Sequence, residues 1–200
     1  IEIKISKRRI SYKIAMKFLN KRVEEIQVKK SKELLWILEH PLTYSAGIRF
    51  NDKEILDKKI KIIKTNRGGK ITLHNPGQKV IYFVLNLNKR KKDIRKLISC
   101  VEKSIIEILK LYKINGKVDK KNIGIWVNNK KIAAIGLRVS KWIAYHGFSI
   151  NIKNELKSYK KIIPCGITTR EVTNLKNLKD QKYNYFKKKV IKNFIKYLKV

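Results

Sequence analysis

Apolar and polar residues recur along this chain with two different spacings, and each spacing predicts a different kind of element. Residues 12–28 and 93–112 place apolar side chains three or four positions apart with polar side chains between them, as an amphipathic helix does. The same spacing returns near the C-terminus, over about residues 181–199, where the polar positions are mostly lysine. The pattern therefore predicts three helices, each with one apolar face.

Short apolar runs predict buried strands between these helices. They lie at 34–38 (LLWIL), 80–87 (VIYFVLNL), 124–127 (GIWV), 131–139 (KIAAIGLRV) and 142–152 (WIAYHGFSINI). The first ends at His40 because a residue before proline disfavours the helical region. An Asn-Asn-Lys turn at 128–130 joins the third and fourth runs, which indicates a hairpin. The expected fold class is α/β (α+β), a single domain over residues 1–200 with a mixed β-sheet and flanking helices.

The basic helix near the C-terminus has two interpretations. A cationic amphipathic helix can lie on a membrane surface. Its apolar face, which includes Phe186, Val190 and Phe194, can equally dock on the domain's own sheet. We expect docking, because a chain of 200 residues buries roughly 70% of its unfolded surface and needs such faces for its core.

The net charge of +35 first suggests nucleic acid as a partner. However, the lysines are spread over the whole chain together with many isoleucines and asparagines, a composition that A/T-rich codons produce. Arginine, which reads bases and phosphates better, is scarce beside lysine. No zinc-finger spacing or recognition helix is evident, so we expect no nucleic-acid partner.

Apolar runs and cysteines indicate where the protein works. No uninterrupted apolar run approaches the roughly 20 residues that a membrane span needs, and the first ten residues, IEIKISKRRI, lack the apolar segment of a signal peptide. Two cysteines far apart in sequence do not form a disulfide framework. We expect a cytoplasmic protein without a membrane partner, in a reducing compartment where its thiols stay free.

Cys165 stands between a proline and a glycine in IIPCGITTREVT, at the end of an apolar run. A small residue in such a turn can simply fill a gap. Alternatively, the turn presents the thiol as a nucleophile, which then requires a basic partner elsewhere in the chain. The residues alone leave both interpretations open. Cys100 flanks the apolar stripe of the helix at 93–112, and we expect it to be a packing residue.

Three further segments contain residues suited to chemistry. In RGGKITLHNPGQ (67–78), Gly68 and Gly69 allow close approach of the backbone to a ligand, although hairpin turns use such pairs too. His74 in that string is by itself most simply a structural histidine. Lys131 opens the strand KIAAIG and either extends to water or points into a cleft as an acid/base. In YHGFS (145–149), the glycine within a strand pattern suggests close approach of another group to the backbone.

Together these segments resemble the octanoyltransferases of lipoate biosynthesis. The resemblance runs from about Tyr12 to Leu175 and rests on five motifs that stand in the family's order and spacing. They are LEHPLTYSAG (38–47), RGGKITLHNPGQ (67–78), GIWVNNKKIAAIGLRV (124–139), WIAYHGFSIN (142–151) and IIPCGI (162–167). Two departures are visible: Leu73 replaces an aromatic residue and could alter how an acyl tail is held, and Asn75 replaces a glycine.

The resemblance implies a fold, a reaction and a site. The fold would be that of the biotin/lipoate protein ligases. The activity would be transfer of an octanoyl group from octanoyl-acyl carrier protein to a lysine of lipoyl domains, in 2-oxoacid dehydrogenase complexes and the glycine cleavage H protein, as the first step of endogenous lipoylation. Cys165 would carry the group as an acyl-thioester, and Lys131 would be the acid/base that lowers the thiol pKa. The implied substrate-binding residues are Arg67, Gly68, Gly69, Lys70, Ile71, Thr72, Leu73, His74, Ala134, Ile135, Gly136, Gly147, Phe148 and Ser149. No cofactor and no metal are implied.

The residue types suit this chemistry. A nearby ammonium favours the thiolate, the nucleophilic form of cysteine. Backbone N–H groups beside Gly166 or in the glycine loop could stabilise the tetrahedral oxyanion. The small residues Ala133, Ala134 and Gly136 leave room for an eight-carbon chain. Burial of each CH₂ contributes about 0.8 kcal/mol, so the depth of a slot can select chain length.

Two rival functions remain. An ATP-dependent lipoate or biotin protein ligase would share the fold and a similar lysine but would not need Cys165. A non-catalytic, basic nucleic-acid-binding protein is the more distant alternative. If the transferase interpretation holds, part of the positive charge would attract acidic carrier proteins and lipoyl domains, and their affinity should then fall as salt rises.

Overall fold

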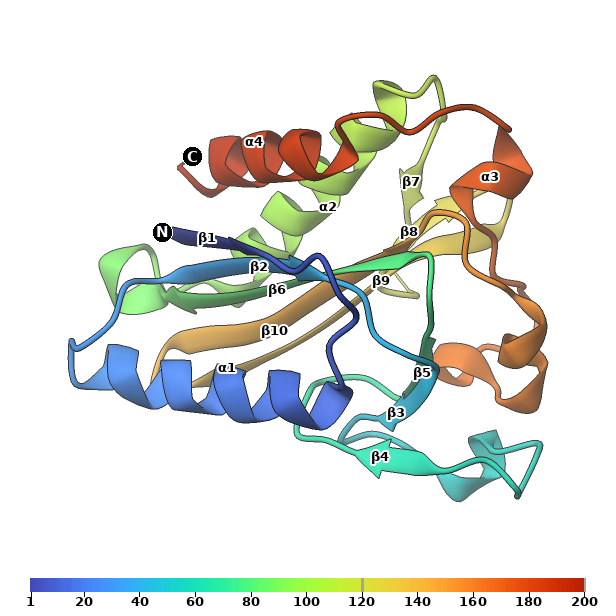
Figure 1. Ribbon diagram of the computed structural model, residues 1–200, viewed down its shortest axis with the longest axis horizontal. Coiled ribbons are helices and arrows are strands. Elements are labelled where there is room, and N and C mark those ends of the chain that lie inside the picture. Colours follow the sequence, from blue (N-terminus) through green and yellow to red (C-terminus); the bar gives the residue numbers. More distant parts are fainter. Residues whose placement is uncertain (120, 200) are drawn as a thin grey trace.

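The computed structural model describes residues 1–119 and 121–199, and these residues form a seven-stranded mixed sheet at the centre of the molecule (Figure 1). Its strands, in spatial order, are β1 (Glu2–Ile5), β2 (Leu34–Leu38), β6 (Gln78–Asn86), β10 (Ile143–Asn151), β9 (Lys130–Ser140), β8 (Ile125–Val127) and β7 (Lys117–Val118). β1 and β2 run parallel, and the other neighbouring pairs are antiparallel. The mixed sheet expected from the sequence is thereby confirmed.

A second, three-stranded sheet lies beside one end of the large sheet (Figure 1). It consists of β4 (Ile62–Lys64), β3 (Thr43–Ala46) and β5 (Ile71–His74), with β3 in the middle. β3 is parallel to β4 and antiparallel to β5. The sequence did not indicate this sheet, because strands of three or four residues are too short to show a period of two.

The described residues include four α-helices and four short 3₁₀ segments. The α-helices are α1 (Tyr12–Gln27), α2 (Ile94–Lys110), α3 (Leu175–Leu178) and α4 (Phe186–Leu198). The 3₁₀ segments are η1 (Asp52–Glu54), η2 (Leu87–Lys89), η3 (Lys157–Lys161) and η4 (Pro164–Gly166). Side chains of Ser11 and Asp93 cap α1 and α2 by accepting bonds from the third backbone N–H beyond them. The three helices expected from the apolar spacing are confirmed.

Helices cover both faces of the large sheet, which is why its central strands are apolar on both sides. Along β2, Leu35 and Ile37 pack in the cluster formed with α2 and α4. Leu34 and Trp36 alternate with them and pack against α1 on the opposite face. Nearly continuous apolar runs are expected of strands buried on both faces.

The C-terminal helix docks on the protein itself, as expected. Phe194 of α4 stacks on Phe83 of β6 with ring centroids 5.5 Å apart, and it also contacts Phe148 of β10. The Cys100 thiol on α2 is buried and donates to the carbonyl of Tyr197 at 3.1 Å, so this cysteine is a packing residue. Within the described ranges, no helix has the length and apolar character to cross a membrane.

Two tight turns connect the strands that follow α2. Asn128 and Asn129 both have positive φ, of 47° and 62°, in the turn between β8 and β9. This is the pattern of a type I′ hairpin turn and confirms the predicted hairpin. Lys141 and Trp142 have the same pattern, with φ of 47° and 60°, between β9 and β10. Trp142, which was expected at the start of a strand, therefore lies in a turn.

Candidate active site

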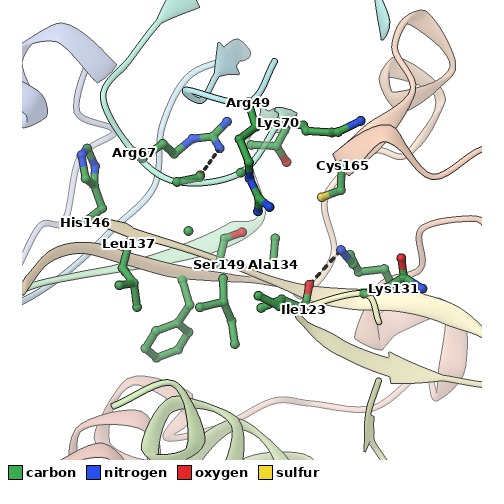
Figure 2. Close-up of a pocket in the computed structure, with 18 of the residues that line it drawn as sticks. Arg49, Arg67, Lys70, Ile123, Lys131, Ala134, Leu137, His146, Ser149 and Cys165 are labelled. Atoms are coloured by element: carbon green, nitrogen blue, oxygen red, sulfur yellow. Dashed lines mark hydrogen bonds between the residues drawn. The ribbon is translucent and has the colours of Figure 1, made fainter. Parts of the chain in front are cut away.

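A pocket with a volume of about 490 Å³ lies between the small sheet and the large sheet. Its floor comes from β6, β9 and β10, and β5 with the loop before it forms the opposite side. Two residues from distant parts of the sequence, Lys131 and Cys165, both line it. Figure 2 shows their side chains directed into the same part of the pocket.

Backbone pairing explains how residues 34 positions apart meet. After Cys165 the chain turns back along the start of β9, where Val172 forms a bridge with Lys131. The Lys131 N–H donates to the carbonyl of Glu171 at 2.8 Å, and the Thr173 N–H donates to the carbonyl of Lys131 at 2.9 Å. The segment that carries the cysteine is therefore held directly to the residue that supplies the amine.

Lys131 is 6% exposed, and its ammonium has defined neighbours. Nζ donates to the carbonyl of Ile123 at 3.1 Å and lies 4.9 Å from the centroid of the Trp126 ring (Figure 2). Gly124 has a φ of +136°, and a Cβ there would stand 3.1 Å from Cε of Lys131 and 2.6 Å from the carbonyl oxygen of Ala133. Only glycine fits beside this lysine, so its side chain is confined rather than free in solvent.

Cys165 is half-buried on η4 and has a φ of +58°, in the left-handed region that residues other than glycine rarely adopt. Such local strain is frequent at functional sites. The N–H of Gly166 donates to Ile163 at 3.0 Å, so it is already used inside the turn. The Gly166 and Ile167 N–H groups are therefore not available to an oxyanion, whereas the N–H of Cys165 itself has no hydrogen-bond partner among the described residues. Among the described residues, the N–H groups of Gly69 and Lys70 have no hydrogen-bond partner and remain candidates.

An ion pair fixes the loop of Cys165 from the opposite side. Lys70 packs along Gly166, and its ammonium lies 2.7 Å from a carboxylate oxygen of Glu54. The Glu54 side chain is almost fully buried and also accepts a bond from the Ile71 N–H at 3.3 Å. The Glu54 carbonyl in turn accepts from the Ile163 N–H at 2.8 Å. Lys70, expected to bind substrate, therefore also positions the cysteine turn.

Small residues form part of the floor of the pocket. In the register of the sheet, Ser149 lies between Val80 and Ala134, and Gly147 lies between Tyr82 and Gly136. A Cβ on Gly136 would come within 3.2 Å of the carbonyl oxygen of Gly68 in the loop above. A Cβ on Gly147 would come within 2.1 Å of the carbonyl oxygen of Ile81, so both glycines allow close approach of neighbouring backbone beside the pocket.

The loop of the RGG motif is anchored to both sheets. The buried Arg67 guanidinium donates to the carbonyl and hydroxyl oxygens of Ser45 at 2.7 and 3.0 Å. The Gly68 N–H donates to the carbonyl of Leu137, on the open edge of β9, at 3.1 Å. Arg67 and Gly68 together therefore connect the two sheets across the pocket.

Most of the residues implied by the family resemblance line this pocket, but two do not. The residues found in its lining are Arg67, Gly68, Gly69, Lys70, Thr72, His74, Ala134, Ile135, Gly136, Gly147, Phe148 and Ser149. Ile71 and Leu73 instead lie fully buried in a separate apolar cluster behind β5. They alternate with Thr72 and His74, so their side chains point to the other face of the strand. Leu73 is thus not placed to hold an acyl tail. Ala133, which was expected to leave room for the acyl chain, lies in the core rather than in the main pocket.

Several lining residues were not anticipated from the sequence. Tyr12 begins the predicted helix and Tyr82 lies in a predicted buried strand, and both line the pocket. Arg49 follows β3, which the sequence did not indicate, and Figure 2 shows its side chain hanging over the floor. His146 stands in the YHGFS string and could have been named, since a polar residue beside a glycine in a strand is unusual.

Three buried histidines around the pocket stay neutral. Burial lowers the pKa of His74 and of His146 to about 3, and lowers that of His40 to about 4. His146 bonds to Asn66 through Nε2 at 2.8 Å, whereas its buried Nδ1 has no partner among the described residues. None of the three rings is thus a cation at neutral pH.

These histidines make the stability sensitive to mild acid. Because their folded pKa values lie below the ordinary value of 6.5, the unfolded chain binds more protons between about pH 6.5 and 4. We therefore expect the free energy of unfolding to fall by about 1 to 2 kcal/mol per histidine between pH 7 and pH 5, measured by urea unfolding. His146→Asn, which tolerates a positive φ, should remove about one third of this dependence. Equal stability at the two pH values would contradict the assignment.

Comparison with known proteins shows that the chain is similar to enzymes of one class. The sequence matches the lipoyl protein ligase A/B catalytic domain over residues 11–195. An octanoyltransferase from Wolbachia sp. subsp. Brugia malayi is 45% identical over 183 residues, with 89% of each chain covered. One from Bartonella tribocorum is 40% identical over 192 residues, covering 89% of this chain and 78% of that one.

Solved structures agree in fold at much lower sequence identity. A lipoate-protein ligase A bound with ATP superposes with a TM-score of 0.77 at 15% identity, covering 100% of this chain and 86% of that one. A biotin protein ligase from Aquifex aeolicus in complex with biotin and ATP gives 0.61 at 17% identity, covering 99% and 70%. At such identities the likeness concerns the fold.

The fold and the matched domain define a catalytic domain of the lipoyl protein ligase class. Within that class, the chain belongs to the octanoyltransferase family, whose members are acyltransferases.

Proposed function

We propose that this protein transfers an octanoyl group from octanoyl-acyl carrier protein to a lysine of lipoyl domains, through a thioester on Cys165. The acceptors would be the lipoyl domains of 2-oxoacid dehydrogenase complexes and the glycine cleavage H protein. The observation that carries the proposal is the pocket shared by Cys165 and Lys131, with a floor of small residues. An ATP-dependent ligase has no need of a thiol at this position.

In the first half-reaction, the proton of the Cys165 thiol is held by Lys131 as its ammonium, and the Cys165 thiolate attacks the carbonyl carbon of the donor thioester. A carbon–sulfur bond forms to Cys165, and the bond to the donor sulfur breaks. The donor thiolate leaves and takes the proton back from the Lys131 ammonium. One thioester replaces another, so the step is nearly balanced in free energy.

In the second half-reaction, the amine of the acceptor lysine attacks the Cys165 thioester. A carbon–nitrogen bond forms, the carbon–sulfur bond breaks, and the proton lost by the amine passes through Lys131 to the Cys165 sulfur. The free N–H groups of Gly69 and Lys70 are candidates to stabilise the oxyanion in both halves, because both residues line the same pocket as Cys165. Because the amide product is more stable than the thioester, the second half-reaction drives the overall transfer toward product.

Intact mass spectrometry of the protein mixed with octanoyl-acyl carrier protein tests this proposal. We expect one octanoyl adduct that maps to Cys165 and disappears when a lipoyl domain is added. Formation of octanoyl or lipoyl product only with ATP and the free acid would support the ligase instead. Tight nucleic-acid binding at physiological salt without any acyl transfer would support the non-catalytic alternative.

A further inference from the structure

Four aromatic rings close the buried end of the pocket. Tyr12, His74 and Tyr82 line it, and His40 stands behind them. Ring centroids lie 5.2 Å apart for Tyr12 and His40, 5.8 Å apart for Tyr12 and His74, and 5.5 Å apart for His40 and His74. We call these four residues the ring wall.

Hydrogen bonds hold the ring wall in place. His40 donates through Nδ1 to the carbonyl of Ile10 at 2.6 Å, so its Nε2 accepts from the Tyr82 hydroxyl at 2.8 Å. His74 bonds through Nδ1 to Oε1 of Gln78 at 2.7 Å. Gln78 is buried, and its amide nitrogen donates to the Leu73 carbonyl at 3.2 Å, which fixes its orientation. His40, His74 and Tyr82 therefore cannot yield to a ligand without breaking buried hydrogen bonds, and Tyr12 is held by ring contacts with both histidines.

An acyl chain on Cys165 has two directions available. Toward the loop at 121–123 the pocket opens to solvent, and Ile123 there is 45% exposed. Toward the ring wall the lining is buried, and His74 is only 7% exposed. Because an apolar chain gains free energy by leaving water, it should run to the buried end.

The length of this path matches a medium chain. Thr72 borders the small hollow beside Cys165, and His74 belongs to the ring wall. These two residues of β5 are separated by about 7 Å along the strand. An extended alkyl chain advances about 1.25 Å per carbon, given carbon–carbon bonds of about 1.5 Å, so five or six carbons span this distance.

We propose that the ring wall of Tyr12, His40, His74 and Tyr82 sets the length of the acyl chain that this transferase accepts, with His74 as the main determinant. This inference rests on the proposed function. A longer chain would have to displace buried polar groups from their partners, which costs more than the burial of its added methylenes returns. Selection against long chains is therefore stronger than an apolar slot alone would give.

Competition among acyl carrier proteins loaded with 6-, 8-, 10- and 12-carbon chains tests the ring wall. The readout is relative kcat/KM for the Cys165 adduct, followed by intact mass. We expect the unmodified protein to disfavour the 12-carbon chain at least about tenfold against octanoyl. His74→Val and Tyr12→Leu should each raise its relative kcat/KM about tenfold or more. Val80→Met, which adds volume in front of the wall, should shift the preference toward the 6-carbon chain.

Leu73→Val is the matched control, because Leu73 is the neighbour of His74 on β5 and faces away from the pocket. It should leave the order of chain lengths unchanged. Two results would overturn the role of the ring wall. One is an unchanged order of preferred chain lengths in both His74→Val and Tyr12→Leu. The other is a change of that order caused instead by Leu137→Ala on the opposite side of β9. If the unmodified protein forms no adduct with any donor, the proposed function itself fails, whereas an adduct with an unaltered length profile refutes only this inference.

Discussion

Cys165→Ala is expected to abolish the octanoyl adduct and to lower octanoyl transfer about a thousandfold or more, because the reaction loses the atom that carries the acyl group. No other thiol of the described chain can replace it. Cys100 is buried on α2, and burial raises its pKa, which disfavours the reactive thiolate. The measurement is transfer from octanoyl-acyl carrier protein to a lipoyl domain, followed with intact mass of the enzyme.

Cys100→Ala is the control for this prediction. Its thiol donates to a backbone carbonyl of α4 and is not among the residues that line the pocket, so the variant should keep the adduct even if it unfolds at a lower temperature. Circular dichroism on both variants separates loss of chemistry from loss of fold. Full transfer by folded Cys165→Ala would exclude the thioester route, and dependence of that transfer on ATP would identify a ligase.

The central elements of the fold could be predicted because their signals are long. The 16-residue helix α1 and the 17-residue helix α2 repeat the apolar spacing over several turns. β6 and β10 are nine residues each, and β6 is apolar throughout its middle. The small sheet gave no such signal, because β3, β4 and β5 have three or four residues each and depend on pairing with one another.

Sequence motifs predicted which segments line the site but not which side chains of those segments face the pocket. The string at 67–78 identified a lining segment, but a motif does not say which face each side chain takes. Alternation along β5 sends Thr72 and His74 into the pocket and Leu73 out of it. The sequence places Tyr12 only at the start of an amphipathic helix, since nothing local shows that α1 begins at the end of a pocket. Backbone strain at Cys165 and the turn at Lys141 and Trp142 likewise depend on tertiary contacts.

Lys131→Met is expected to leave the protein folded and to slow acylation of Cys165 by about a hundredfold to ten-thousandfold, the usual contribution of a positioned acid/base. Methionine is similar in length to lysine and can stay against the Trp126 ring, so the fold around β9 should persist. Without the amine, the thiol loses the base to which the proposed mechanism assigns its proton. Alkylation of Cys165 by iodoacetamide at neutral pH should slow as well, because the thiolate is the reacting form.

Lys130→Met provides the matched control, one residue earlier on the same strand. The Lys130 ammonium is exposed and pairs with Glu171, and alternation along β9 directs it away from Lys131. Both variants remove one positive charge, so general electrostatic effects on an acidic donor are common to the two. A difference in alkylation rate between them therefore reports the local action of the Lys131 amine on the sulfur. Equal rates for Lys131→Met and the unmodified protein would show that the two side chains act independently, and the proton transfer assigned to Lys131 would then have to be abandoned.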